Sequence, residues 1–142
     1  MENSADFMLS WAEHYFRSRD AFYKNIQSMG RKDGRLHIAY KDKEEDILPY
    51  PELKVPENVQ KNISIITLNI RKNLDELYGN WDKYASIVSL KVYFINPSSS
   101  LEKKWVISPY VHSKISDKSS LKAGLNALFE TVEPVLQENV QS

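Results

Sequence analysis

The chain has 142 residues, of which 42% are hydrophobic and 11% aromatic, and it carries 19 basic and 19 acidic residues. This length predicts one domain, 1–142, with frayed ends at 1–4 and 137–142. Its core is expected to be large enough to fold without cross-links such as disulfides or metal ions. The absence of cysteine excludes disulfides, thiol nucleophiles and cysteine–zinc sites, and the balanced charge excludes a general attraction to nucleic acid or anionic membranes.

Hydrophobic residues occur only in short runs, whereas a membrane-spanning helix needs about 20 consecutive apolar residues. The first residues, 1–6, contain no basic segment followed by an apolar one, as a secretion signal would. We therefore expect a cytoplasmic protein with no membrane partner.

The first predicted element is a long amphipathic helix over about 5–29. Its apolar residues recur at steps of three and four, which is the period of one helical face. The residues that share this face are Phe7, Met8, Trp11, Ala12, Tyr15, Phe16, Phe22, Tyr23, Ile26 and Met29. Gly30 suits the left-handed position that follows a helix, so we expect the helix to end there.

Two strands are predicted next. Residues 36–41 alternate between apolar and polar side chains, as in a half-buried strand, and 31–34 form the turn before it. Residues 42–46 are acidic and predict a solvated turn, after which 47–50 returns as a short strand. Pro49 lacks an amide hydrogen, so this strand is expected at the edge of the sheet.

The centre of the chain predicts a strand, a helix and a second strand. Residues 63–70 contain four isoleucines in eight positions, which is typical of a strand covered on both faces. Asn73 with Glu76 forms a capping-box pattern that predicts a helix start, and Gly79 weakens that helix. Residues 90–95 form the second apolar strand, so the three elements predict a right-handed crossover between parallel strands.

The last part of the chain predicts a strand at 104–108, antiparallel to 90–95. An irregular stretch over 110–116 follows, and a final helix begins near Asp117 or Ser119 and ends near Glu133, before Pro134. The whole order is α-β-β-β-α-β-β-α. It predicts an α/β fold on the boundary with α+β, in which helices cover a mixed sheet of about five strands with a central parallel pair.

Candidate binding residues follow from this topology. Ligands of open α/β sheets gather beyond the carboxyl ends of parallel strands, where Asn69, Arg71, Asn73 and Asn96 are expected. The three histidines have no metal-ligand spacing, but His112 lies in a loop that follows a strand, where binding residues are common. We therefore predict binding at these five residues, and no metal site. The alternative is that the asparagines only cap and turn the chain.

A basic stretch offers a second hypothesis, because six basic and two acidic residues lie between positions 17 and 35. Arg17, Arg31, Lys32 and Arg35 are the candidate phosphate contacts. If they bind nucleic acid, the affinity must fall steeply with salt. The alternative is that the charges complement the dipole at the end of the first helix.

Asp46 is followed by Glu52 and Lys54, an Asp…Glu-x-Lys string. In metal-dependent nucleases two carboxylates hold a divalent ion and a lysine steadies charge. Together with the order α-β-β-β-α-β, the string resembles the core of the PD-(D/E)XK nuclease superfamily. The resemblance implies a Mg²⁺-dependent phosphodiesterase, active or inactive. It departs from the family in placing Glu52 and Lys54 between two prolines, whereas the family carries them on a central strand.

The sequence has no glycine-rich phosphate loop and no nucleophile elbow. We therefore expect a non-catalytic binding or interaction protein that needs no cofactor and that forms a homodimer, since its tyrosines and tryptophans suit an interface. The nuclease that uses Asp46, Glu52 and Lys54 is the alternative.

Overall fold

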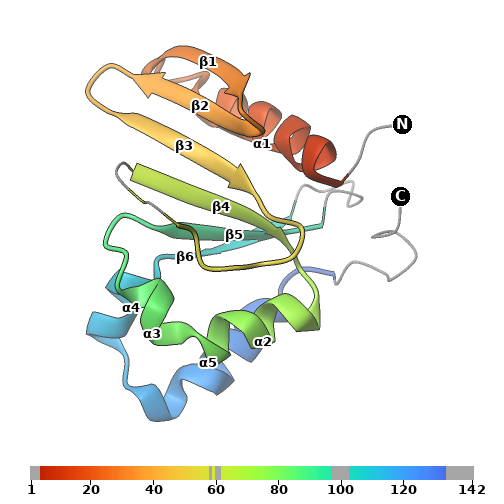
Figure 1. Ribbon diagram of the computed structural model, residues 1–142, viewed down its shortest axis with the longest axis vertical. Coiled ribbons are helices and arrows are strands. Elements are labelled where there is room, and N and C mark those ends of the chain that lie inside the picture. Colours follow the sequence, from red (N-terminus) through yellow and green to blue (C-terminus); the bar gives the residue numbers. More distant parts are fainter. Residues whose placement is uncertain (1–3, 58, 60–61, 97–102, 134–142) are drawn as a thin grey trace.

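A computed structural model describes residues 4–57, 59, 62–96 and 103–133. One mixed sheet of six strands, in the order β1-β2-β3-β4-β5-β6, runs through the molecule (Figure 1). The strands are β1 (Ile26–Lys32), β2 (Arg35–Tyr40), β3 (Glu44–Pro49), β4 (Asn62–Leu68), β5 (Lys91–Ile95) and β6 (Lys104–Ile107). β3, β4 and β5 are parallel neighbours, and the other pairs are antiparallel.

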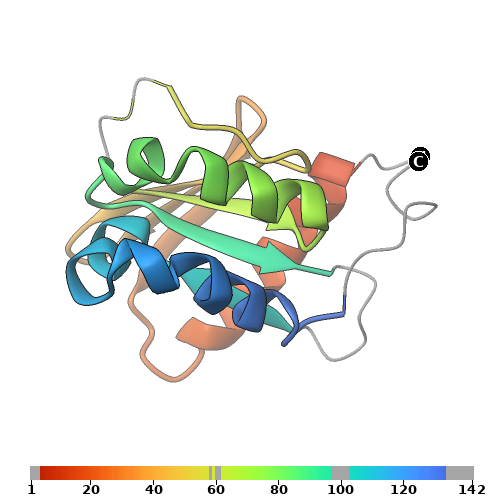
Figure 2. The same cartoon turned by 90° about the horizontal axis from the view of Figure 1, so that it is seen from below.

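Helices cover the two faces of this sheet unequally. α1 (Ser4–Asp20) packs on one face, and the other face carries α2 (Arg71–Gly79), α3 (Trp81–Ala85), α4 (Pro109–Ile115) and α5 (Leu121–Phe129), with a 3₁₀ turn, η1 (Lys118–Ser120), before α5 (Figures 1 and 2). Among the described residues, the buried strand residues under the four helices come from β3 to β6. That face of β1 and β2 is therefore left open.

The predicted α/β class, the parallel pair β4–β5 and its helical crossover are confirmed. β4 and β5 form because their side chains are buried on both faces: Tyr93 packs towards α1, and its neighbour Phe94 stacks on Trp105 at 4.0 Å under the opposite helices. The structure adds a second parallel pair, β3–β4, and a sixth strand, so the order before α2 is α-β-β-β-β.

The predicted helix over 5–29 is wrong beyond Asp20. Both carboxylate oxygens of Asp20 accept backbone N–H groups, of Asn25 and Ile26, and so end the helix. β1 has a register irregularity between Ile26 and Ser28, and an extra residue there places Ile26 and Met29 on one face although they are three apart. The bulge therefore gives the apolar residues of this strand a spacing that is typical of a helix.

Three further corrections concern segments predicted as turns, caps or loops. Residues 44–46 belong to β3, so they are not part of a solvated turn. α2 begins at Arg71, and the buried Asn73 does not cap it. Residues 110–115 lie in α4, which Pro109 opens because a proline at the first position of a helix loses no hydrogen bond.

β3 is an interior strand, although Pro49 predicted an edge. Its pairing with β2 stops at Ile47, whereas its pairing with β4 continues to Pro49, opposite Ile66. Pro49 thus lies beyond the ladder that would need its amide hydrogen.

The final helix follows the prediction at its start. Asp117 accepts a hydrogen bond from the Ser120 backbone N–H and caps η1, which leads directly into α5. α5 ends at Phe129, earlier than predicted. The predicted frayed residues 1–3 and 137–142 and Pro134 lie outside the described residues, and Ser4 opens α1. Within the described ranges, no helix has the length and apolar character needed to cross a membrane.

Candidate functional site

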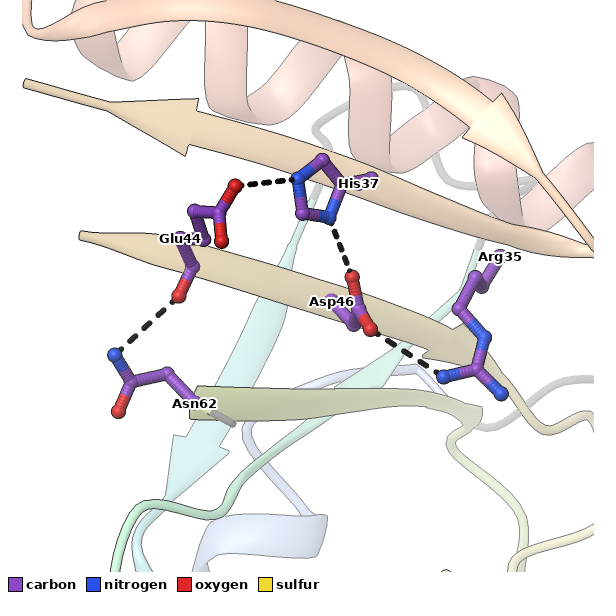
Figure 3. Close-up of polar contacts among 5 residues, drawn as sticks. All are labelled: Arg35, His37, Glu44, Asp46 and Asn62. Atoms are coloured by element: carbon purple, nitrogen blue, oxygen red, sulfur yellow. Dashed lines mark hydrogen bonds and ion pairs between the residues drawn. The ribbon is translucent and has the colours of Figure 1, made fainter. Parts of the chain in front are cut away.

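A polar cluster lies on the open face of β2 and β3 (Figure 3). Leu36 and Ile38 of β2 face α1 and are fully buried, so Arg35 and His37 point to the opposite side. The register pairs His37 with Asp46 of β3. Strand alternation and antiparallel pairing therefore place these side chains together.

Asp46 is the best fixed member of this cluster, with a side chain only 14% exposed. One of its oxygens lies 2.7 Å from Nδ1 of His37, and the other accepts a hydrogen bond from Arg35 at 3.3 Å. Burial on its own would raise the pKa of Asp46, but the hydrogen bonds from His37 and Arg35 lower it below its usual value. Asp46 is therefore an ionised anchor that orients both neighbours.

His37 lies between two carboxylates. Its Nε2 is 3.3 Å from an oxygen of Glu44, whose side chain is 55% exposed. Glu44 is tied to the next strand through its backbone carbonyl, which accepts from the side chain of Asn62 (Figure 3). The ring can donate to both carboxylates at once only when it is protonated.

The cluster borders a hollow of about 470 Å³. Its lining residues are Lys32, Asp33, Arg35, His37, Glu44 and Asp46. Lys32 and Arg35 are direct partners across the β1–β2 hairpin, so two positive side chains lie side by side at its end. Gly30, which pairs with His37, has open space where a side chain would stand. These features make the surface accessible to a ligand.

The four predicted phosphate contacts are divided by the structure. Lys32 and Arg35 share the hollow, whereas Arg31 faces α1 and bonds to Glu13 and Ser10. Arg17 lies on α1 itself. Three of the four candidates therefore belong to the β1–β2 hairpin, and Arg17 lies in the last turn of α1, as the dipole alternative expects.

The predicted asparagine cluster is buried at the carboxyl ends of β4 and β5. Asn69 is fully buried: its amide donates to the carbonyls of Phe129 and Val132, and its oxygen accepts from Trp105 Nε1 at 2.8 Å. Asn96 donates to the carbonyl of Glu133. These contacts fasten the end of α5 over the strand ends.

Asn73 performs a similar role for the segment after β3. It accepts from the backbone N–H of Leu53, and its amide lies 2.9 Å from oxygens of Pro51, Thr67 and Leu68. These contacts engage both the oxygen and the amide of the Asn69 and Asn73 side chains. A binding role for the asparagines stays a prediction.

The other two predicted binding residues also contact protein groups. Arg71 bonds to Asn126 and lies over the ring of Phe129, 4.6 Å from its centre. His112 is on α4 and meets Trp81 edge to face, with ring centres 5.6 Å apart. The structure thus places His112 against a residue of α3, whereas Asn69 contacts Trp105 of β6.

The residues of the nuclease alternative have separate partners. Asp46 bonds to His37 and Arg35, Glu52 pairs with Lys72 at the surface, and Lys54 lies over the ring of Tyr50. In 4–57, 59, 62–96 and 103–133, no group of three or more histidine or acidic side chains is placed to hold a metal ion.

Of the site members that the sequence did not single out (Asp33, His37 and Glu44), His37 is the one that contacts two acidic residues of β3. Its spacing of two from Arg35 showed that both share a strand face. Their contact with Asp46 required the hairpin register, which the sequence did not supply. In comparisons with known proteins, no family model, no curated protein and no solved structure matches this chain.

Proposed function

We propose that this protein is a non-catalytic binding protein whose open sheet face takes an anionic group, specifically a phosphate, between Lys32 and Arg35. The observation that carries this proposal is the direct pairing of Lys32 with Arg35 across the hairpin. Like charges placed directly opposite in a sheet lower its stability, and a bound anion relieves that repulsion.

The remaining donors of the site fit the same ligand. Arg35 uses one nitrogen on Asp46, its side chain is 46% exposed, and a guanidinium has five N–H donors in all. Its planar group suits the paired oxygens of a phosphate. Asp46 holds Arg35 and His37 in place from the side, so the site is organised before the ligand arrives.

The test is a titration followed by heteronuclear NMR at low salt. One arm uses inorganic phosphate, and the other uses a short single-stranded oligonucleotide, which separates a small phosphate ligand from a nucleic acid. We expect amide shifts concentrated in 32–37 and 44–46. The affinity for the oligonucleotide is expected to fall with added salt, in proportion to the few phosphates contacted.

The matched variants are Arg35→Gln and Arg17→Gln. Arg35→Gln removes a charge from the hollow, so we expect at least about a tenfold loss of affinity. Arg17→Gln removes the same charge from α1 and is expected to leave the affinity unchanged. Equal weakening by both variants, or the absence of saturable binding in both arms, would refute the proposal.

The remaining expectations stay predictions. Gel filtration with light scattering tests the homodimer. The metal-dependent nuclease is tested by cleavage assays with Mg²⁺ or Mn²⁺ that compare the wild type with Asp46→Ala; among the described residues its three side chains have separate partners.

A further inference from the structure

A second cavity lies on the opposite face of the sheet, at the carboxyl end of α1. It has a volume of about 290 Å³ and is bordered by residues of α1, β3 and β5 and by the segments around 25 and 40–43. Its aromatic walls are Phe16, Tyr23, Tyr40 and Tyr93. The position is distinct from the phosphate hollow, because α1 covers this face and the hollow lies on the other.

A buried carboxylate forms part of this cavity. Glu45 is only 8% exposed, and its two oxygens accept hydrogen bonds from the hydroxyls of Tyr40 (3.2 Å) and Ser64 (2.8 Å). The described residues supply no ion pair to it within salt-bridge distance. A carboxylate accepts about four hydrogen bonds, so Glu45 retains capacity for a further donor.

The phenol of Tyr40 is fixed as a donor to this carboxylate. Burial raises the pKa of Tyr40, and the neighbouring Glu45 raises it further, so the hydroxyl keeps its proton. Burying a carboxylate with no cation bonded to it costs free energy, and a cation that binds to it offsets this cost. A ligand cation would supply that partner.

Positive side chains border the same cavity at other points. Arg19 lies beside the hydroxyls of Tyr15 and Tyr93, and Lys43 lies over the Tyr40 ring, 5.3 Å from its centre. Lys91 also lines the cavity.

The acidic neighbour on α1 is already engaged. Both oxygens of Asp20 bond to the backbone N–H groups of Asn25 and Ile26, at 2.8 and 2.9 Å. The cavity therefore offers a buried acceptor at one point and the cations of Arg19, Lys43 and the half-buried Lys91 at others, between aromatic walls.

We propose that this cavity binds a free α-amino acid with an aromatic side chain. Its ammonium group would bond to Glu45, its carboxylate to Arg19, and its ring would pack among the tyrosines. A volume of about 290 Å³ is near the lower end for ligand sites, which fits a ligand of this size. This inference does not rest on the phosphate site.

The test uses three related probes in NMR titrations of the full chain. L-Phenylalanine carries both charges, 2-phenylethylamine lacks the carboxylate, and N-acetyl-L-phenylalanine lacks the cation. We expect L-phenylalanine to bind at least about tenfold more tightly than either analogue, because each lost charged hydrogen bond weakens binding by that order. Its shifts should cluster at residues 19–25 and 40–45.

Variants locate the two charges. Glu45→Gln keeps the shape of the side chain but removes its charge, and Arg19→Gln changes an exposed residue and leaves the core intact. We expect each to weaken L-phenylalanine about tenfold, and Arg35→Gln on the other face to have no effect.

Two outcomes would overturn the inference. One is equal affinity for the three probes, because the charges would then not take part. The other is binding that Arg19→Gln leaves unchanged. If Glu45→Gln fails to fold, Arg19→Gln together with the probe series still decides the question.

Discussion

Asp46 joins two strands and two cationic side chains, so its protonation is coupled to the stability of the fold. Its pKa is lowered in the folded state by His37 and Arg35, relative to about 3.9 in the unfolded chain. Its contribution to the free energy of unfolding is therefore present above about pH 4, and it is lost as the pH falls through the folded-state pKa.

The first prediction follows from this coupling. Asp46→Asn is expected to lower the free energy of unfolding by about 1–2 kcal/mol at pH 7, and the difference from the wild type should shrink near pH 3. Urea denaturation at both pH values measures it. The control is Asp82→Asn, because Asp82 is 83% exposed and its ion pair with Lys118 is expected to contribute at most about 0.5 kcal/mol. A pH-independent difference would contradict this assignment.

Asn69 stabilises the fold through hydrogen bonds of its buried side chain. It is fully buried, and its amide and oxygen hold two carbonyls near α5 and the Trp105 indole. Asn69→Ala leaves all three groups unsatisfied, so we expect a loss of about 3 kcal/mol or more in the free energy of unfolding. Asn62→Ala, at an exposed position, is expected to change it by about 0.5 kcal/mol or less. Similar losses for both variants would show that Asn69 is not a structural anchor.

At the scale of elements, the β1–β2 hairpin depends on its two-residue turn. Asp33 and Gly34 both have positive φ, 54° and 76°, which is the requirement of a type I′ turn. This turn sets the register that brings Lys32 opposite Arg35, whereas the pairing of His37 with Asp46 belongs to the next pair of strands, β2 and β3. The side-by-side positive charges of the phosphate hollow thus depend on the backbone conformation at Asp33 and Gly34.

A matched pair of glycine variants tests this dependence. Gly34→Ala is expected to lower the free energy of unfolding by about 1 kcal/mol, because alanine is strained at positive φ. Gly30→Ala, in β1 with open space around it, is expected to leave stability unchanged or to raise it by about 0.5 kcal/mol. Thermal unfolding of both variants provides the comparison, and a greater loss at Gly30 would be inconsistent with the hairpin described.

Prediction of elements from the sequence succeeded where a segment had one clear hydrophobic pattern along its whole length. β4 and β5 are continuous apolar runs and were located within about two residues. It failed at β1, because the bulge at Ile26–Ser28 gives a strand the spacing of a helix. It also failed at residues 44–46, whose charges suggested a solvated turn, although Glu45 is buried against hydroxyl groups.

At the scale of the whole molecule, the sheet separates the two proposed sites. The phosphate hollow lies on the open face, and the cavity at Glu45 lies on the face that α1 covers. No residue in the described part of the chain lines both. We therefore expect binding at the two sites to be independent.

This independence is a further prediction. With phosphate and L-phenylalanine both near saturation, the gain in the free energy of unfolding should equal the sum of the separate gains, within about 0.5 kcal/mol. Urea denaturation with each ligand alone and with both together measures it. Competition between the ligands would mean that they share one site.

The sequence by itself determined the fold class, the central parallel strands and their crossover, because burial on both faces leaves a local record in continuous apolar residues. Only the tertiary structure decided the candidate sites. Arg35, His37 and Asp46 meet through the register of two hairpin-linked strands, and Glu45 is buried because Tyr40 and Ser64 reach it from β2 and β4. Such contacts depend on cross-strand pairing, which composition and periodicity do not encode.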